Sequence, residues 1–245
     1  MSTWWRRRLG PHLGGVAGEI LATLQAVVAS GRDLVDLPER VRARLIAQQD
    51  TSEIIIGWMQ VAAIVTFASL YSLTPKAFPP TVPFEPVPWT LGVYGLFTAL
   101  RLWLAHRRRL RGGMLHLSVV IDMAVLMVTI WSFHLQYQAP PALYLKAPTL
   151  MYVFILIALR ALRFDPHYVI LAGLTAAAGW LVLVAYAVQY AEGSMPITRD
   201  FATYVTSYSI LLGAEFDKVI SMLAVTGILA FALVRTRRLL LGAIA

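Results

Sequence analysis

The stretch that decides the fold is LHLSVVIDMAVLMVTIWSFH, residues 115–134. It is long enough to cross a bilayer as a helix, because a hydrocarbon core about 30 Å thick takes roughly 20 helical residues. Backbone groups in lipid must find their hydrogen-bond partners within the protein, and a helix supplies them. Asp122 is the one acidic residue of the stretch. The stretch therefore predicts a transmembrane helix that carries a single carboxylate.

Further apolar stretches lie on both sides of this one. They occupy residues 54–73, 89–104, 148–162, 167–188 and 216–234, of which 89–104 and 148–162 are short. Hydrophobic residues make up 58% of the 245 residues and charged residues only 14%, far from the averages of soluble domains. A water-soluble fold could not hide that much apolar surface. We therefore predict an all-α integral membrane protein, a bundle of six transmembrane helices.

Lysine and arginine are unevenly distributed between these stretches. If the N-terminus is cytoplasmic, only four of the 21 basic residues lie in outer segments, namely Lys76, Lys146, Arg199 and Lys218. Basic residues near span ends are retained on the cytoplasmic side. The bias and its alternation predict an even number of spans in the inner (plasma) membrane of the cell, with both termini cytoplasmic.

The formal net charge of +8 and the lack of cysteine exclude several classes of function. The arginines stand in short clusters between apolar runs, which is typical of charges flanking bilayer spans. Without cysteine there is no disulfide, thiolate metal site or cysteine nucleophile. No glycine-rich phosphate loop, GxSxG or HExxH motif occurs either. We expect the lipid bilayer as a partner, no nucleic acid, and no catalytic residues in this chain.

The remaining segments define three regions. Residues 1–52 are expected to be a cytoplasmic, amphipathic helical segment, lying either at the lipid headgroups or against a cytoplasmic partner. Residues 53–234 are the membrane domain. Residues 235–245 continue the last helix into the cytoplasm as the start of a transducing helix, since no glycine or proline lies between Val234 and Leu241.

Ionisable residues inside spans are the first candidates for a functional site, because their burial in lipid is costly. Asp122 lies about seven residues, on the order of 10 Å, from the cytoplasmic end of its span. Arg160, near the inner end of the fourth stretch, is long enough to meet it. We predict a structural Asp122–Arg160 pair. A proton or ion path through Asp122 is the alternative.

A second cluster, Glu215, Asp217 and Lys218, lies at the outer mouth of the last stretch. The helix dipole alone favours acidic residues in a first turn. With His134, the two carboxylates could instead bind a divalent cation or a small ligand. However, residues two apart point in different directions on a helix.

The stretch 167–188 also carries a small-residue face that permits close helix approach, within the chain or across a dimer. Its members are Ala172, Gly173, Ala176, Ala177 and Gly179.

Three segments and the basic exit carry a family resemblance. They are LRALRFDPHYVILAGL at 159–174, ITRDF at 197–201 and GAEFDK at 213–218, with basic residues at 235–238. Together they resemble the N-terminal six-helix membrane domain of bacterial class III adenylate cyclases, over roughly residues 49–245. The cyclase half, with its metal-binding aspartates, is absent from this chain. The resemblance therefore implies no catalytic residue, no cofactor and no enzyme activity here.

The resemblance implies a sensor or anchor. Such a domain forms a homodimer and passes signals through its last helix to a cytoplasmic nucleotidyl cyclase domain, which makes cAMP. It further implies an inner turn at Arg163, Asp165 and Pro166, an outer-face cluster at Glu215, Asp217 and Lys218, and an output connection at residues 235–245. A small transporter or channel and a purely structural membrane anchor are the alternatives.

Overall fold

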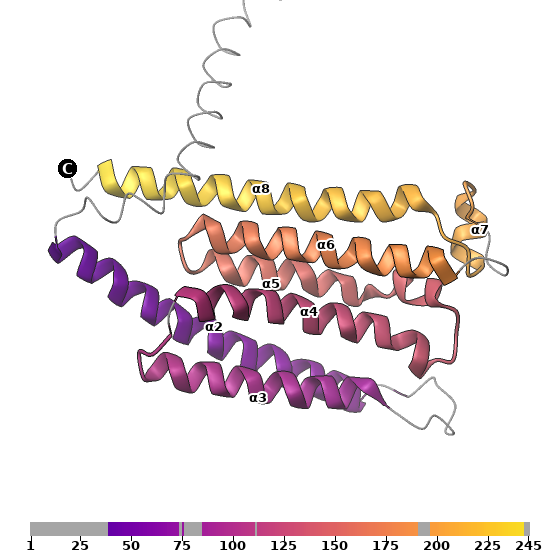
Figure 1. Cartoon of the computed structure of the whole chain (residues 1–245), viewed down its shortest axis with the longest axis horizontal. Helices are drawn as coiled ribbons and strands as arrows, with labels where there is room; N and C mark the ends of the chain where they lie inside the picture. Colours follow the sequence, from indigo (N-terminus) through magenta and orange to yellow (C-terminus); the bar gives the residue numbers. More distant parts are fainter. Residues whose placement is uncertain (1–38, 74, 76–84, 111, 191–196, 243–245) are drawn as a thin grey trace, which may run out of the picture.

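The computed structural model describes residues 39–73, 75, 85–110, 112–190 and 197–242, and these form a bundle of helices (Figure 1). The only pairing of β type in this part of the chain is an isolated bridge between Ile197 and Ile210. The prediction of an all-α chain is confirmed for the described residues. Most of the predicted N-terminal segment, residues 1–38, lies outside them, as do residues 243–245.

Consecutive long helices run in opposite directions, joined at the two ends of the bundle (Figure 1). The elements are α2 (Glu39–Leu73), α3 (Pro86–His106), α4 (Gly112–Gln136), the 3-10 helices η1 (Pro141–Lys146) and η2 (Pro148–Met151), α5 (Tyr152–Ala161), α6 (Pro166–Tyr190), α7 (Phe201–Thr206) and α8 (Leu212–Gly242). The arginine-rich connections therefore lie at one end of the bundle and the short helices η1 and α7 at the other.

Four helical segments in the described residues are long and apolar enough to cross a membrane. They are Thr51–Leu73, Gly112–Gln136, Pro166–Tyr190 and Leu212–Arg237. Each of these segments contains one of the predicted apolar stretches. The structure and the sequence therefore both indicate a membrane protein. The helices at the two short stretches are not among these four segments. α3 has 21 residues but is less apolar than the four, and Pro148–Ala161 is apolar but shorter than they are.

Two helices extend well beyond the apolar stretches. α2 continues without a break from Glu39 to Leu73, so the boundary predicted at residues 52–53 lies inside a helix. α8 continues past Val234 to Gly242, in agreement with the absence of glycine or proline there. In each of these helices, the apolar segment that could cross the bilayer and a segment with basic residues therefore form one continuous helix.

The hydrophobic core is built by α4, α5, α6 and α8 with η1 and η2. Its fully buried members include Val119, Ile130, Val153 and Val169. The hairpin of α2 and α3 contributes none of the residues of this core cluster. Its two helices pack on each other, and it lies on the side of the bundle opposite α8 (Figure 1). The hairpin is thus attached to the core by other contacts.

α6 and α8 approach each other closely at Gly173. A Cβ atom at Gly173 would lie 1.9 Å from the Thr226 Oγ1 atom, so only glycine allows this spacing. Ala172 and Ala176 on the same face are fully buried. The small-residue face predicted on α6 is therefore used within the chain.

Candidate functional site

Asp122 is the centre of a buried polar network at the junction between the hairpin and the core. Its side chain is only 2% exposed. Oδ2 forms an ion pair with the Arg160 guanidinium and accepts a hydrogen bond of 2.8 Å from Gln60 Nε2. Arg101 Nη1 lies 3.5 Å from Oδ2, and the Tyr94 hydroxyl donates to Oδ1 at 3.0 Å. The network therefore joins α2, α3, α4 and α5.

Asp122 and Arg160 are thus in contact, as the sequence predicts, but Asp122 is shared with a second arginine. The distribution of basic residues places Arg101 in the inner, cytoplasmic group, because it is not one of the four outer residues. The structure instead buries it, 4% exposed, with a hydrogen bond to the Gln60 side-chain oxygen. Its position inside the stretch 89–104 was the available signal, because a charge at that depth needs a partner.

A second buried ion pair joins the same two parts of the molecule. Arg163, after α5, donates to Glu53 on α2 at 2.6 Å, and its guanidinium lies over the Tyr168 ring at 4.2 Å. Asp165, in the predicted inner turn, accepts a hydrogen bond from the His167 backbone at 3.1 Å. Glu53 was not among the predicted site residues, and only its tertiary contact identifies it.

These buried groups hold the hairpin on the core. Asp122 and Glu53 supply two negative charges, while Arg101, Arg160 and Arg163 supply three positive charges. Buried charges persist only where they are paired and hydrogen-bonded, since their desolvation is costly. Separating the hairpin from the core would break the Arg101–Asp122 and Arg163–Glu53 ion pairs, whereas the Asp122–Arg160 pair lies within the core.

The second cluster lies at the opposite end of the bundle around Glu215, which is 2% exposed. The Lys218 ammonium donates to both carboxylate oxygens at 2.9 Å. Trp180 Nε1 on α6 donates at 3.1 Å, and the Tyr204 hydroxyl on α7 donates at 3.3 Å. Lys218 also donates to the Leu145 carbonyl at 2.6 Å. Glu215 therefore ties α6 and α7 to the start of α8, and Lys218 ties η1 to it.

Lys146 completes this cluster. Its ammonium donates to the Tyr204 and Ser207 carbonyls and lies 4.5 Å from the centre of the Tyr204 ring. Desolvation lowers the pKa of Lys146, while nearby Glu215 acts in the opposite direction. Burial and the neighbouring Glu215 carboxylate raise the pKa of Tyr204 to about 12. The short helix α7 is thus fixed to the bundle by charged groups.

The predicted set of His134, Glu215 and Asp217 is not assembled. Asp217 is exposed, on a different side of α8 from buried Glu215, because residues two apart on a helix diverge. The His134 ring bonds to the Trp131 carbonyl and packs against Tyr144. Among the described residues, no group of three His, Cys, Asp or Glu side chains is placed to hold a metal ion.

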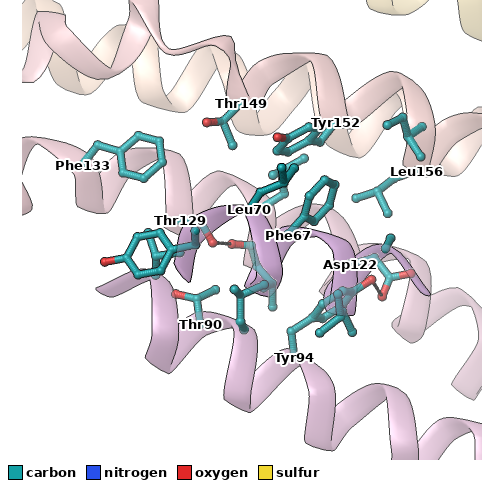
Figure 2. A pocket seen from close by; sticks show the side chains of 18 of the residues that line it. Phe67, Leu70, Thr90, Tyr94, Asp122, Thr129, Phe133, Thr149, Tyr152 and Leu156 are labelled. Atoms are coloured by element: carbon teal, nitrogen blue, oxygen red, sulfur yellow. Dashed lines mark hydrogen bonds between the residues drawn. The ribbon is translucent and has the colours of Figure 1, made fainter. Parts of the chain in front are cut away.

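A cavity of about 300 Å³ lies beside the Asp122 network, between the hairpin and the core. Figure 2 shows Tyr94 and Asp122 towards one end of it and Phe133 towards the other. Its walls come from α2, α3, α4, η2 and α5. No sequence pattern indicates this cavity, because its residues are drawn from five separate elements.

Comparison with known proteins finds no match for this chain among protein-family models, curated proteins or solved structures. The functional proposal therefore depends on the resemblance in the sequence and on the geometry described above.

Proposed function

We propose that this chain is the membrane sensor or anchor domain of an adenylate cyclase. In this proposal it forms a homodimer and passes a signal through α8 to a cytoplasmic nucleotidyl cyclase domain, which carries the catalytic residues. The observation that carries the proposal is the continuity of α8. Its 31 residues correspond to about 46 Å of helix, more than the roughly 30 Å of a hydrocarbon core.

The two ends of α8 suit a transmitting element. Near its start Glu215 and Lys218 contact η1, α6 and α7. Near its far end lie Arg235 and Arg237, beyond the apolar stretch. A helix moves as a stiff rod, so a displacement at the Glu215 cluster would reach the basic end without a hinge to absorb it.

We also propose that six helices cross the membrane, with both termini cytoplasmic in the bacterial inner membrane. α3 and η2–α5 run beside the four apolar spans in alternating directions (Figure 1). Arg101, which lowers the hydropathy of α3, is buried within the bundle and not exposed to lipid. The arginine-rich connections at one end agree with the tendency of basic residues to stay cytoplasmic.

A fusion of this chain to a cyclase catalytic domain that requires dimerisation tests the proposal. Insertion of two residues after Val234 rotates the following helix by about 200°, whereas seven residues restore nearly the same face after two turns. Cyclic AMP in a cyclase-deficient bacterium should change with the two-residue insertion and return with the seven-residue insertion. Output that ignores the helical phase would favour a purely structural anchor.

A small transporter or channel is the second candidate, because Asp122 lines a cavity at bilayer depth. Its oxygens already accept from Arg160, Gln60 and Tyr94, which is less favourable for a passing proton or ion. Flux of protons or substrate in liposomes, abolished in Asp122→Asn, would replace the sensor proposal with this one.

A further inference from the structure

The cavity between the hairpin and the core has half-exposed lining residues on α2 and on α5. Among its lining residues, Leu70 on α2 is 52% exposed and Ile155 on α5 is 47% exposed. Both residues belong to apolar helical segments, so the outer surface beside the cavity faces hydrocarbon in the proposed arrangement. A molecule dissolved in the bilayer could enter the cavity without passing through water.

The size and the walls of the cavity suit a small lipophilic molecule. The volume of about 300 Å³ is at the lower end of the range for small-molecule pockets, about 300–1,000 Å³. At about 30 Å³ for a water-sized group, it has room for roughly ten such groups. The middle of the cavity is lined by apolar side chains, including Ala63, Ile64, Phe67 and Leu126.

The end of the cavity at Asp122 offers no unused donor. The Gln60 amide nitrogen donates to both Asp122 and Tyr94, and the Tyr94 hydroxyl donates to Asp122. Arg101 and Arg160 neutralise Asp122 from outside the cavity lining. A polar group of a ligand would gain little there, since these hydrogen bonds would first have to be broken.

The opposite end has an unused acceptor. Gln136 lines the cavity and is 1% exposed, and its Oε1 atom has no hydrogen-bond partner among the described residues. The amide orientation follows from its neighbours, because the Tyr71 hydroxyl donates to Glu85 and can only accept from Gln136 Nε2. A buried carbonyl without a donor is costly and calls for an explanation.

Two threonines extend this acceptor surface. Thr90 and Thr129 line the cavity (Figure 2), and their hydroxyl protons are used by the carbonyls of Pro86 and Val125. Their oxygens can therefore only accept further hydrogen bonds. A carboxylate or phosphate finds no donor in Gln136 Oε1, Thr90 or Thr129 and would also have to be desolvated. An ammonium group does not fit either. It would lose its hydration shell at the Gln136 end of the cavity, where no carboxylate is among the lining residues to compensate for that loss.

We infer that this cavity binds an uncharged, hydrogen-bond-donating amphiphile from the bilayer, such as a medium-chain alcohol. Its hydroxyl donates to Gln136 Oε1, and its hydrocarbon chain lies along the apolar walls towards Tyr94. The ligand touches α2 and α3 on one side and α4 and α5 on the other, so its occupancy would favour one packing of the hairpin on the core. This inference deepens the proposed sensor function by naming its ligand class.

Binding can be measured on the purified chain in nanodiscs with a diazirine-bearing decanol as the photoreactive probe. Labels mapped by mass spectrometry should fall on cavity-lining residues of α2, α4 and α5, and excess 1-decanol should suppress them. Decane, which lacks the donor, and decanoate, which only accepts, should compete about tenfold less well, as expected for one lost hydrogen bond to a buried acceptor. Equal competition by decane would overturn the inference.

Two neighbouring alanines give a matched pair of variants. Ala63 lines the cavity, whereas Ala62, the preceding residue of α2, is exposed and does not line it. Ala63→Trp should abolish the labelling and Ala62→Trp should preserve it. Equal labelling of both variants would place the probe on the outer surface and refute the inference.

Gln136→Leu separates ligand binding from folding. This variant removes both the unused acceptor and the long hydrogen bond of 3.5 Å to the Tyr71 hydroxyl, and the effects of these two losses on stability oppose each other. The ligand-free protein should therefore keep its thermal midpoint, while its affinity for 1-decanol should fall about tenfold. Unchanged affinity would refute the assignment of the headgroup. The sensor proposal fails separately, if 1-decanol binds the chain but leaves the cyclic AMP output of the fusion unchanged.

Discussion

The hairpin–core seam and the α6–α8 seam hold helices together in different ways. In the first, Gln60, Tyr94 and Arg101 of the hairpin contact Asp122 of the core, next to a cavity. Glu53 of the hairpin pairs with Arg163. In the second, Gly173 brings α6 against Thr226 on α8 without space for a methyl group. Helices in lipid gain nothing from hydrophobic association alone, so they use either polar contacts or close packing.

The contrast indicates which part of the molecule can move. A seam of ion pairs beside a cavity has room for a second arrangement, whereas a close-packed seam does not adjust continuously. In the proposed signalling the hairpin therefore changes its packing on the core, and α6 and α8 move together as one rigid unit. The following predictions, ordered by expected effect, test this contrast.

Asp122→Ala should have the largest effect. It leaves the guanidiniums of Arg101 and Arg160 buried without their carboxylate, which should lower the free energy of unfolding by about 3–5 kcal/mol. Equilibrium unfolding in mixed micelles, followed by tryptophan fluorescence, measures this loss. Combining Asp122→Leu with methionine at both arginine positions should recover most of it. If Asp122→Ala lowered the free energy of unfolding by less than Gly173→Ala does, the polar network would not be what holds the hairpin on the core.

Gly173→Ala should be the next in size. The added methyl group overlaps Thr226 on α8, and overpacking of this kind costs about 1–3 kcal/mol. The same unfolding measurement applies. Gly227→Ala is the control on α8, because a Cβ atom there meets nothing within 4 Å. If both variants behave alike, the α6–α8 seam is not close-packed.

Glu215→Gln should lower the free energy of unfolding by about 1.5 kcal/mol. The variant removes the negative charge that accepts hydrogen bonds from Lys218 and Tyr204. Asp217→Asn is the matched control two residues away. It is exposed and should change the unfolding free energy by less than about 0.5 kcal/mol. A larger effect at Asp217 than at Glu215 would restore the predicted outer-face ligand role of Asp217.

The smallest effect concerns pH. The pKa of Tyr204 is raised to about 12 in the folded protein, against a usual value near 10. The neutral hydroxyl therefore contributes stability that is fully present below about pH 10 and is lost as the pH rises through 12. The difference in tyrosinate absorbance between the wild type and Tyr204→Phe should titrate near pH 12. A midpoint near 10 would mean that Tyr204 does not contact Glu215.

The two acidic site residues illustrate what sequence reasoning can reach. The contact of Asp122 with Arg160 was predictable, because a lone carboxylate inside an apolar stretch must find a cation. The sharing of that carboxylate with Arg101 was not, because it depends on how α3 is rotated against α4. Glu215 was identified as a candidate for its place in the first turn of α8, whereas its bonds to Trp180 and Tyr204 depend on α6 and α7.

The sequence by itself determined the helical class, the membrane setting and the segregation of arginine between the apolar stretches. These properties are local, since the length and composition of one segment decide whether its backbone can be satisfied in lipid. Only the tertiary structure decided that the hairpin packs on the outside of the hydrophobic core, that Glu53 pairs with Arg163, and that Gln136 lines a cavity. Each of these depends on the rotation and spacing of helices distant in the chain, which no single segment encodes.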